Sequence, residues 1–218
     1  MSLSQQIAAV RAEFSKQVPA ETRQVMQQAT ADLAKSALVE QALNVGDRLP
    51  DFTLPNATGE AIAIRNLLAQ GSVVVSFYRG GWCPYCNLEL RALQQALPEI
   101  QALGASLVAI SPETPDSSLT TAEKNELDFQ VLSDVGNRVA RQFGLVFTLP
   151  EELRPIYEGF GIDIPAHNGD ATFELPLAAT YVVAADGTIV HAFVDADYTR
   201  RLEPAEIVAA LKRQAVAV

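Results

Sequence analysis

Val73 to Cys86, VVVSFYRGGWCPYC, is the stretch that decides the fold of this 218-residue chain. It begins with a nearly continuous apolar run, which is typical of a strand buried on both faces. A glycine pair follows, and then leucines at helical spacing from Leu90 onward, with Gly104 as a helix stop. The stretch therefore predicts a buried strand that turns directly into a helix, and both cysteines of the chain lie at that junction.

Cys83 and Cys86 have the C-x-x-C spacing, which permits an internal disulfide. At a helix start, unpartnered N–H groups and the helix dipole favour a nearby anion and lower the pKa of a thiol. The thiolate is the attacking species, and a second thiol within reach resolves the mixed disulfide that it forms. Pro84 fits the first helical turn, where its missing N–H would have had no partner. The pattern favours a redox-active dithiol.

Two other interpretations of the cysteine pair are less favoured. A zinc site with two cysteines and two histidines would need both His167 and His191, which come from distant segments without the usual short spacing. His191 lies in an apolar run and is expected to be structural. Two buried thiols without chemistry are the other interpretation, because free cysteine is often a small core residue. No glycine-rich phosphate loop follows a strand, so we expect no nucleotide cofactor. The histidine spacing argues against a metal, and we expect none.

The remaining patterns predict an α/β fold with a mixed central sheet and helices on both faces. Asp186-Gly187 is a hairpin signal between two apolar runs, and a last helix is expected from Pro204. Residues 145–175, punctuated by proline and glycine, are expected to form a long ordered excursion over the surface. The other strands are expected at 107–110, 180–183 and 189–193.

Residues 1–45 contain no glycine and a single proline, Pro19. Two amphipathic helices are expected there, separated near Pro19, with apolar stripes at Leu3, Ile7, Val10 and Phe14 and at Met26, Ala29, Leu33 and Ala37. Neither helix buries its stripe alone, which leaves two alternatives: packing on the main body, or an interface in a homodimer. We therefore divide the chain into an N-terminal helical extension, residues 1–45, and a domain of residues 46–218.

The composition excludes several classes of protein. Sixteen lysines and arginines against 26 acidic residues give a formal charge of −10, which disfavours binding to nucleic acid or to an anionic membrane. The start of the chain has no targeting pattern, and no apolar run approaches the roughly 20 residues of a membrane span. Two cysteines are too few for a disulfide-stapled scaffold. The expectation is a soluble cytoplasmic protein.

From Gly46 onward the chain resembles the peroxiredoxin-like branch of the alkyl hydroperoxide reductase / thiol-specific antioxidant family, within the thioredoxin-fold superfamily. The resemblance is carried by 46–54 (GDRLPDFTL), by 73–86 and by 180–190, and WCPYC is its most specific element. It implies a thioredoxin-like fold and a dithiol/disulfide cycle. It also implies a hydroperoxide or disulfide substrate and an external reductant of the thioredoxin or glutathione type.

The chain departs from the family pattern at three positions. Peroxiredoxins typically carry Pro-x-x-x-Thr-x-x-Cys, and counting back from Cys86 places Arg79 at the proline and Cys83 at the threonine. Ala178 stands before the closing strand, where thioredoxins usually have a cis-proline and many peroxiredoxins an arginine. These replacements favour thiol–disulfide exchange over the ordinary peroxidase reaction. The segment 197–201 (DYTRR) is similar to one in the same branch, but the sequence suggests no mechanism for it.

Three functions remain open for the cysteine pair. In the favoured one, a thiol–disulfide oxidoreductase, Cys83 is the more exposed thiol and attacks, and Cys86, one turn inside the helix, resolves. Cys83 is the expected low-pKa thiol because the dipole effect fades within the first helical turn. In a thiol peroxidase, Cys86 would reduce a peroxide and become a sulfenic acid, with which Cys83 condenses. In a non-catalytic redox sensor, the same disulfide would switch a partner surface. All three predict a disulfide between Cys83 and Cys86.

Residues around the pair have expected roles as well. Arg79 is expected either to hold a thiolate or peroxide oxygen electrostatically or to be a solvated loop arginine. Trp82 and Tyr85 flank the sulfurs and are expected to form an apolar docking surface. Thr180 is expected either to be an ordinary strand threonine, which the pattern favours, or to face the pair across the sheet. The turn at 111–116 is expected at the rim of the cleft.

Overall fold

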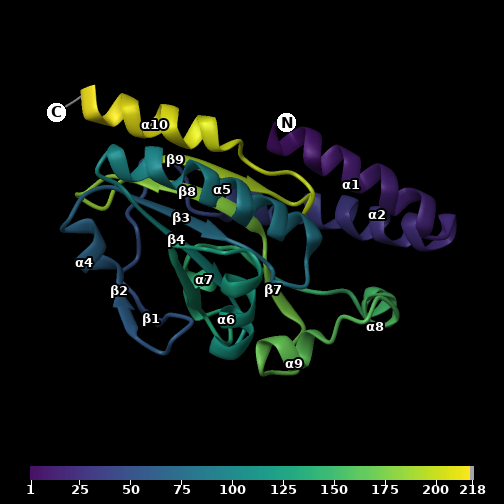
Figure 1. Cartoon of the computed structure of the whole chain (residues 1–218). Helices are drawn as coiled ribbons and strands as arrows, with labels where there is room; N and C mark the ends of the chain where they lie inside the picture. Colours follow the sequence, from purple (N-terminus) through teal and green to yellow (C-terminus); the bar gives the residue numbers. More distant parts are fainter. Residues whose placement is uncertain (217–218) are drawn as a thin grey trace.

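The fold is built on a five-stranded mixed sheet with the order β5-β4-β3-β8-β9 (Figure 1). The computed structural model describes residues 1–216. The predicted buried strand is the central one, β3 (Val73–Phe77), parallel to β4 (Ser106–Ser111) and antiparallel to β8 (Ala178–Val183). β5 (Gln130–Ser133) pairs parallel with β4, and β9 (Ile189–Asp195) pairs antiparallel with β8.

The helices and minor strands surround this sheet. The helices are α1 (Leu3–Gln17), α2 (Ala20–Ala34), α3 (Leu38–Gln41), α4 (Ile64–Leu68), α5 (Pro84–Ala102), α6 (Pro115–Lys124), α7 (Arg138–Gln142), α8 (Arg154–Gly159), α9 (Ile164–Asn168) and α10 (Pro204–Val216), with a 3₁₀ turn, η1 (Glu151–Leu153). The minor strands form two antiparallel pairs, β1 (Thr53–Pro55) with β2 (Ala61–Ala63) and β6 (Val146–Thr148) with β7 (Glu174–Pro176).

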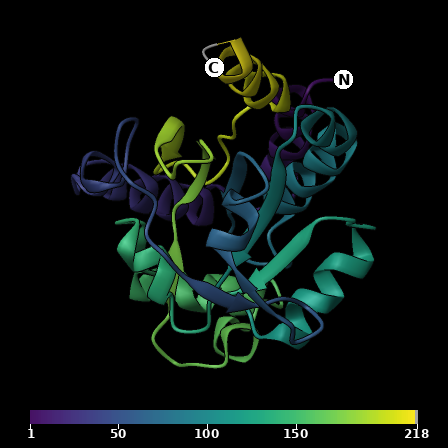
Figure 2. The same cartoon turned by 90° about the vertical axis from the view of Figure 1, so that its left-hand side faces the viewer.

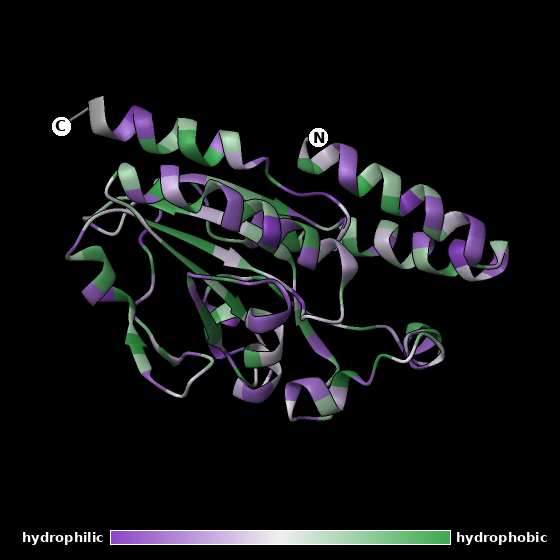
Figure 3. Ribbon diagram, in the orientation of Figure 1, coloured by the Kyte–Doolittle hydropathy of each residue, from purple (hydrophilic) through white to green (hydrophobic). Residues whose placement is uncertain are grey.

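Alternate residues of β3 enter the cores on the two faces of the sheet. Val74 packs into a core with residues of α1, α5 and α10, whereas Val73, Val75 and Phe77 pack into another with residues of α4 and α7. Figure 1 and Figure 2 show α1, α5 and α10 on one side of the sheet. The central strands are mostly hydrophobic along their length (Figure 3), as burial on both faces requires. The predicted mixed sheet with helices on both faces is confirmed.

The N-terminal helices pack on the main body. α1 begins after Ser2, whose side chain accepts from Gln5 N–H in a capping box, and it packs against α5. Leu3 and Ile7 enter the core around α5 and α10, and Met26 of α2 enters a smaller core with η1 and α8. Apolar side chains of both helices are therefore covered within the chain. The homodimer and the domain boundary at residue 46 stay predictions.

Residues 145–175 are not the surface excursion that the sequence predicts. They contain β6, η1, α8, α9 and β7. Their apolar side chains join Met26 in a buried cluster: Leu149, Leu153, Tyr157, Ile164 and Leu175. Each of these elements is too short to show a periodic pattern, which is why the sequence does not reveal them. Among the helices of residues 1–216, none has the length and hydropathy that crossing a membrane requires.

Candidate active site

The active-site loop leaves β3 at Phe77 and enters α5 at Pro84. Cys83 is the N-cap of α5, and Pro84 is the first helical residue, as predicted. Gly81 cannot be replaced without movement, because a Cβ at this position would lie 2.0 Å from Thr121 Oγ1. The lack of a side chain at Gly81 therefore allows the loop to pack closely against α6.

Buried polar side chains hold this loop from below. Gly81 N–H donates to Glu113 Oε2 at 2.9 Å, and Asn87 Nδ2 donates to Gly81 O at 2.8 Å. Glu113 is 1% exposed and also contacts His167, whose Nδ1 lies 3.2 Å from Glu113 Oε1. Through Glu113, the turn at 111–116 therefore supports the active-site loop from inside the protein. The sequence instead predicts that this turn lies at the rim of the cleft.

The two cysteines are free thiols that lie 3 Å apart. Both are fully buried, with 0% exposure. The expectation that Cys83 is the more exposed thiol is therefore wrong, because the aromatic side chains of the surrounding segments cover the helix start. A substrate must therefore pass between these aromatic side chains to reach either sulfur.

Each sulfur has its own arginine. Arg79 Nη2 donates to Cys83 Sγ at 3.5 Å, and Arg201 Nη2 donates to Cys86 Sγ at 3.3 Å. Arg79 is 4% exposed, so it is not a solvated loop arginine. Of the two expectations for Arg79, the structure agrees with the electrostatic contact to a sulfur.

Arg79 is held by aromatic side chains. Its Nη1 donates to Tyr157 Oη at 3.0 Å. Its guanidinium carbon lies 4.1 Å from the ring centre of Tyr198 and 5.1 Å from that of Trp82. These contacts fix the guanidinium by cation–π attraction, and no carboxylate among the described residues pairs with it.

Arg201 is held in a different way. Its Nε donates to the buried carboxylate of Glu89, and its Nη1 donates to the backbone oxygens of Tyr198 and Arg200. Thr180 Oγ1 donates to the other oxygen of Glu89 at 3.4 Å. Thr180 therefore reaches the site through Glu89 and Arg201, and no hydrogen bond among the described residues joins it to either sulfur.

The two thiols have opposite pKa shifts. Burial acts to raise the pKa of Cys83, but the hydrogen bond with Cys86 and the charges of Arg79 and Arg201 outweigh it, so the pKa is lowered. Burial and the neighbouring Cys83 sulfur raise the pKa of Cys86, against the two arginines. These surroundings therefore favour the thiolate on Cys83 over a thiolate on Cys86.

Trp82 and Tyr85 take part in aromatic pairs around the site. Tyr85 is 4% exposed and packs edge-on against Tyr198, with ring centres 5.7 Å apart. Trp82 is partly exposed and packs against Tyr157, also at 5.7 Å. The predicted docking surface is wrong for Tyr85, because its side chain is buried.

The sequence did not identify Tyr157, Tyr198, Arg201 or Glu89 as site residues. Two signals were available for the last two. Glu89 is a charge on the apolar face of a predicted helix, which implies a buried partner. Arg201 belongs to the DYTRR segment, for which the sequence suggests no mechanism.

The zinc interpretation finds no support in the geometry. His167 contacts Glu113, and His191 lies in β9 opposite Val182. Within residues 1–216, no cluster of three or more histidine, cysteine, aspartate and glutamate side chains has the proximity of a metal site.

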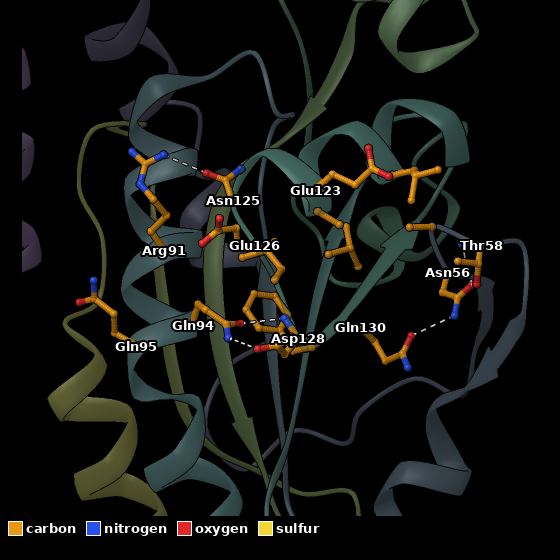
Figure 4. Close-up of a pocket in the computed structure, with 16 residues that line it drawn as sticks. Asn56, Thr58, Arg91, Gln94, Gln95, Glu123, Asn125, Glu126, Asp128 and Gln130 are labelled. Atoms are coloured by element: carbon orange, nitrogen blue, oxygen red, sulfur yellow. Dashed lines mark hydrogen bonds between the residues drawn. The ribbon is translucent and has the colours of Figure 1, made fainter.

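The largest cavity lies away from the cysteines. It has a volume of about 750 Å³ and is lined by polar side chains of α5, of the segment between α6 and β5, and of the loop after β1 (Figure 4). Several of these side chains bond to each other, as Arg91 does to Asn125 and Gln94 to Asp128. Its lining contains neither cysteine and neither of the arginines that contact them, so the redox chemistry lies elsewhere.

Comparison with known proteins gives the family. Residues 45–192 match the profile of the AhpC/TSA family. Peroxiredoxin Bcp of Escherichia coli K12 is 29% identical over 153 residues, which are 70% of this chain and 86% of that protein. A putative peroxiredoxin of Mycobacterium tuberculosis is 33% identical over 114 residues, 52% of this chain and 74% of that protein.

Solved structures show the same fold. The crystal structure of peroxidoxin BcpB from Mycobacterium tuberculosis has a TM-score of 0.62 at 24% identity and covers 78% of this chain and 97% of its own. A peroxiredoxin 6 mutant of Arenicola marina has a TM-score of 0.65 at 15% identity, covering 80% and 74%. The chain belongs to the AhpC/TSA family and is a peroxiredoxin-like enzyme with a thioredoxin fold, whose chemistry depends on thiols.

Proposed function

We propose that this protein is a thiol peroxidase in which Cys83 attacks the hydroperoxide and Cys86 resolves the product. The observation that carries the proposal is the contact of Cys83, the thiol with the lowered pKa, with the guanidinium of Arg79. Arg79 is positioned to stabilise both the thiolate and the negative charge that develops on a peroxide oxygen. The peroxiredoxin relatives support the same reaction class.

The reaction balances with the two cysteines and one proton from the solvent. The Cys83 thiolate attacks one peroxide oxygen, the O–O bond breaks, and the leaving oxygen takes the solvent proton to become an alcohol or water. Cys83 is then a sulfenic acid. The sulfur of Cys86 attacks the sulfur of Cys83, and the thiol proton leaves with the hydroxyl group as water. Because the cysteines are already 3 Å apart, forming this disulfide needs only a local movement.

Burial favours a peroxide over a protein disulfide as the oxidising substrate. A protein disulfide must bring its own sulfur to the attacking thiolate, and both cysteines are 0% exposed. A hydroperoxide is smaller and reaches a buried sulfur with less rearrangement. An external thiol reductant of the thioredoxin or glutathione type then supplies two electrons to restore the dithiol.

Separate Cys83→Ser and Cys86→Ser variants test this order. We expect Cys86→Ser to consume one equivalent of hydrogen peroxide per chain and to form a sulfenic acid that dimedone traps on Cys83. Cys83→Ser should consume almost none, although its remaining thiol is intact. The wild type should turn over repeatedly with dithiothreitol and form the Cys83–Cys86 disulfide.

The contact of Arg201 with Cys86 favours one alternative, in which Cys86 attacks and Cys83 resolves. Dimedone labelling of Cys86 in the Cys83→Ser variant, with an inactive Cys86→Ser variant, would establish that order instead. If the wild type reacted with peroxide only once and was not re-reduced at a useful rate, the protein would be a redox sensor.

A further inference from the structure

A second, smaller cavity connects α2 to the active site. Its volume is about 150 Å³, and it lies between α2, the η1–α8 segment and the ends of β8 and β9. Ala29 and Leu33 of α2 and Leu153 of η1 line it, together with Ala178 at the start of β8. Most of its lining is apolar, so it suits a hydrocarbon group.

The lining of this cavity also includes side chains of the active site. Arg79, Tyr157 and Tyr198 are among its lining residues. Arg79 Nε is buried and has no hydrogen-bond partner among the residues described, whereas Nη2 of the same guanidinium contacts Cys83 Sγ. An unpartnered buried donor is costly, so an oxygen acceptor in this cavity would be favoured. Such an acceptor would bind the same guanidinium that contacts Cys83 Sγ, although neither cysteine lines the cavity itself.

Ala29 and Leu33 lie outside the residues that match the family. The family match covers residues 45–192, and α2 ends at Ala34. One wall of this cavity therefore comes from outside the matched region, whereas both cysteines lie within it. The contact between α2 and the site is made by side chains that are half-buried on the face of α2 turned to the body.

We propose that α2 sets the size of the substrate, with Ala29 and Leu33 as specificity-determining residues. This inference rests on the peroxidase function proposed above. The cavity takes a compact organic hydroperoxide: its hydrocarbon group lies against α2, and a peroxide oxygen accepts a hydrogen bond from Arg79. A volume of 150 Å³ equals roughly five times the volume that one water occupies in the liquid, which fits a branched group of four carbons better than a long chain.

Ala29→Phe tests the role of α2, because the larger side chain would fill part of the cavity. We expect kcat/KM for tert-butyl hydroperoxide to fall at least about tenfold, the effect typical of a steric change in an apolar pocket. We expect kcat/KM for hydrogen peroxide, which has no hydrocarbon group, to change less than about twofold. Leu33→Ala enlarges the cavity and should raise the activity on cumene hydroperoxide relative to tert-butyl hydroperoxide by about fivefold.

Ala31→Phe is the matched control. Ala31 is exposed on the same helix and does not line this cavity, so all peroxide ratios should stay at the wild-type values. Thermal melting of each variant checks that α2 still packs on the body, and only variants with a melting transition are compared.

The ratio of kcat/KM for tert-butyl hydroperoxide to kcat/KM for hydrogen peroxide decides whether α2 selects the substrate. If Ala29→Phe lowered the activity on hydrogen peroxide and tert-butyl hydroperoxide equally, or changed neither, α2 would not select the substrate. The peroxidase proposal would survive both results. A wild-type protein whose thiols react with iodoacetamide but which consumes none of these peroxides would instead overturn the proposed function itself.

Discussion

Arg79 and Arg201 each contact one sulfur of the same dithiol, but their surroundings differ. Arg201 is paired with the buried carboxylate of Glu89, whereas Arg79 is surrounded by Tyr157, Tyr198 and Trp82. A carboxylate neutralises a guanidinium, and an aromatic ring leaves its charge in place. The charge of Arg79 is therefore available to Cys83 and to a substrate, while Arg201 is largely committed to holding α5 to the segment after β9.

Replacing Arg201 should have the largest effect on folding. Arg201→Met leaves Glu89 buried without its partner, and breaking a buried ion pair on one side typically costs about 3–5 kcal/mol. Urea denaturation should show this loss. The double variant Glu89→Gln/Arg201→Met should recover most of it, because no charge is then left unpaired.

Arg200 provides the neighbouring control. It forms an ion pair with Asp195 on the surface, with its side chain 65% exposed. Arg200→Met should change the free energy of unfolding by less than about 1 kcal/mol. If Arg200→Met lowered the free energy of unfolding as much as Arg201→Met, any change in this segment would destabilise the protein. The buried Arg201–Glu89 pair would then not explain the effect of Arg201→Met.

Replacing Arg79 should affect the chemistry more than folding. Arg79→Met removes the donor beside Cys83, and loss of one such donor typically lowers a rate about 100- to 1,000-fold. The measurement is kcat/KM for hydrogen peroxide at pH 7. Arg79→Lys keeps the charge and should retain part of the activity. Equal rates for wild type and Arg79→Met would remove Arg79 from the mechanism.

The dependence of the rate on pH should reflect the lowered pKa of Cys83. A thiol with an ordinary pKa of about 8.5 gains roughly 25-fold in thiolate between pH 7 and pH 9. Cys83 has a lowered pKa, so its peroxide rate should rise much less over this range than that of an ordinary thiol. The rate should fall only on acidification through the lowered pKa. Stopped-flow peroxide consumption across pH 5–9 checks this, and a steep rise above pH 8 would contradict it.

The smallest expected effect on kcat/KM comes from removing the hydroxyl group of Tyr157, which accepts a hydrogen bond from Arg79. Tyr157→Phe removes one hydrogen bond to the guanidinium and keeps the ring that packs on Trp82. A hydrogen bond contributes about 0.5–1.5 kcal/mol, so kcat/KM should fall by roughly 2- to 10-fold. If Tyr157→Phe lost as much activity as Arg79→Met, the hydroxyl itself would have to touch the substrate.

The sequence predicted the parts of this site that depend on local patterns. The apolar run at 73–77 and the leucines after Pro84 place a strand-to-helix turn at the cysteines, and the structure has that turn. The order of the strands was not predicted. The contact between Arg201 and Cys86 joins residues 115 positions apart, and no local pattern predicts such a pairing.

Burial was the property that the sequence misjudged. A helix N-terminus is usually accessible, so the sequence predicted an exposed Cys83 and left an exposed Arg79 as one alternative. Tyr198 and Tyr157 cover them, and both tyrosines come from segments with weak periodicity. The contribution of α2 to the small cavity depends on the same tertiary packing, which the sequence of residues 1–45 alone does not contain.

The central claim is that Cys83, and not Cys86, is the thiolate of the reduced site. A pH titration of the protein labelled with ¹³C at cysteine Cβ tests it directly, because the chain has only two cysteines and the method needs no reagent to reach buried thiols. We expect the Cβ resonance of Cys83 to report a thiolate well below pH 9 and that of Cys86 to remain a thiol above it. A titration in which Cys86 ionises first would contradict the account.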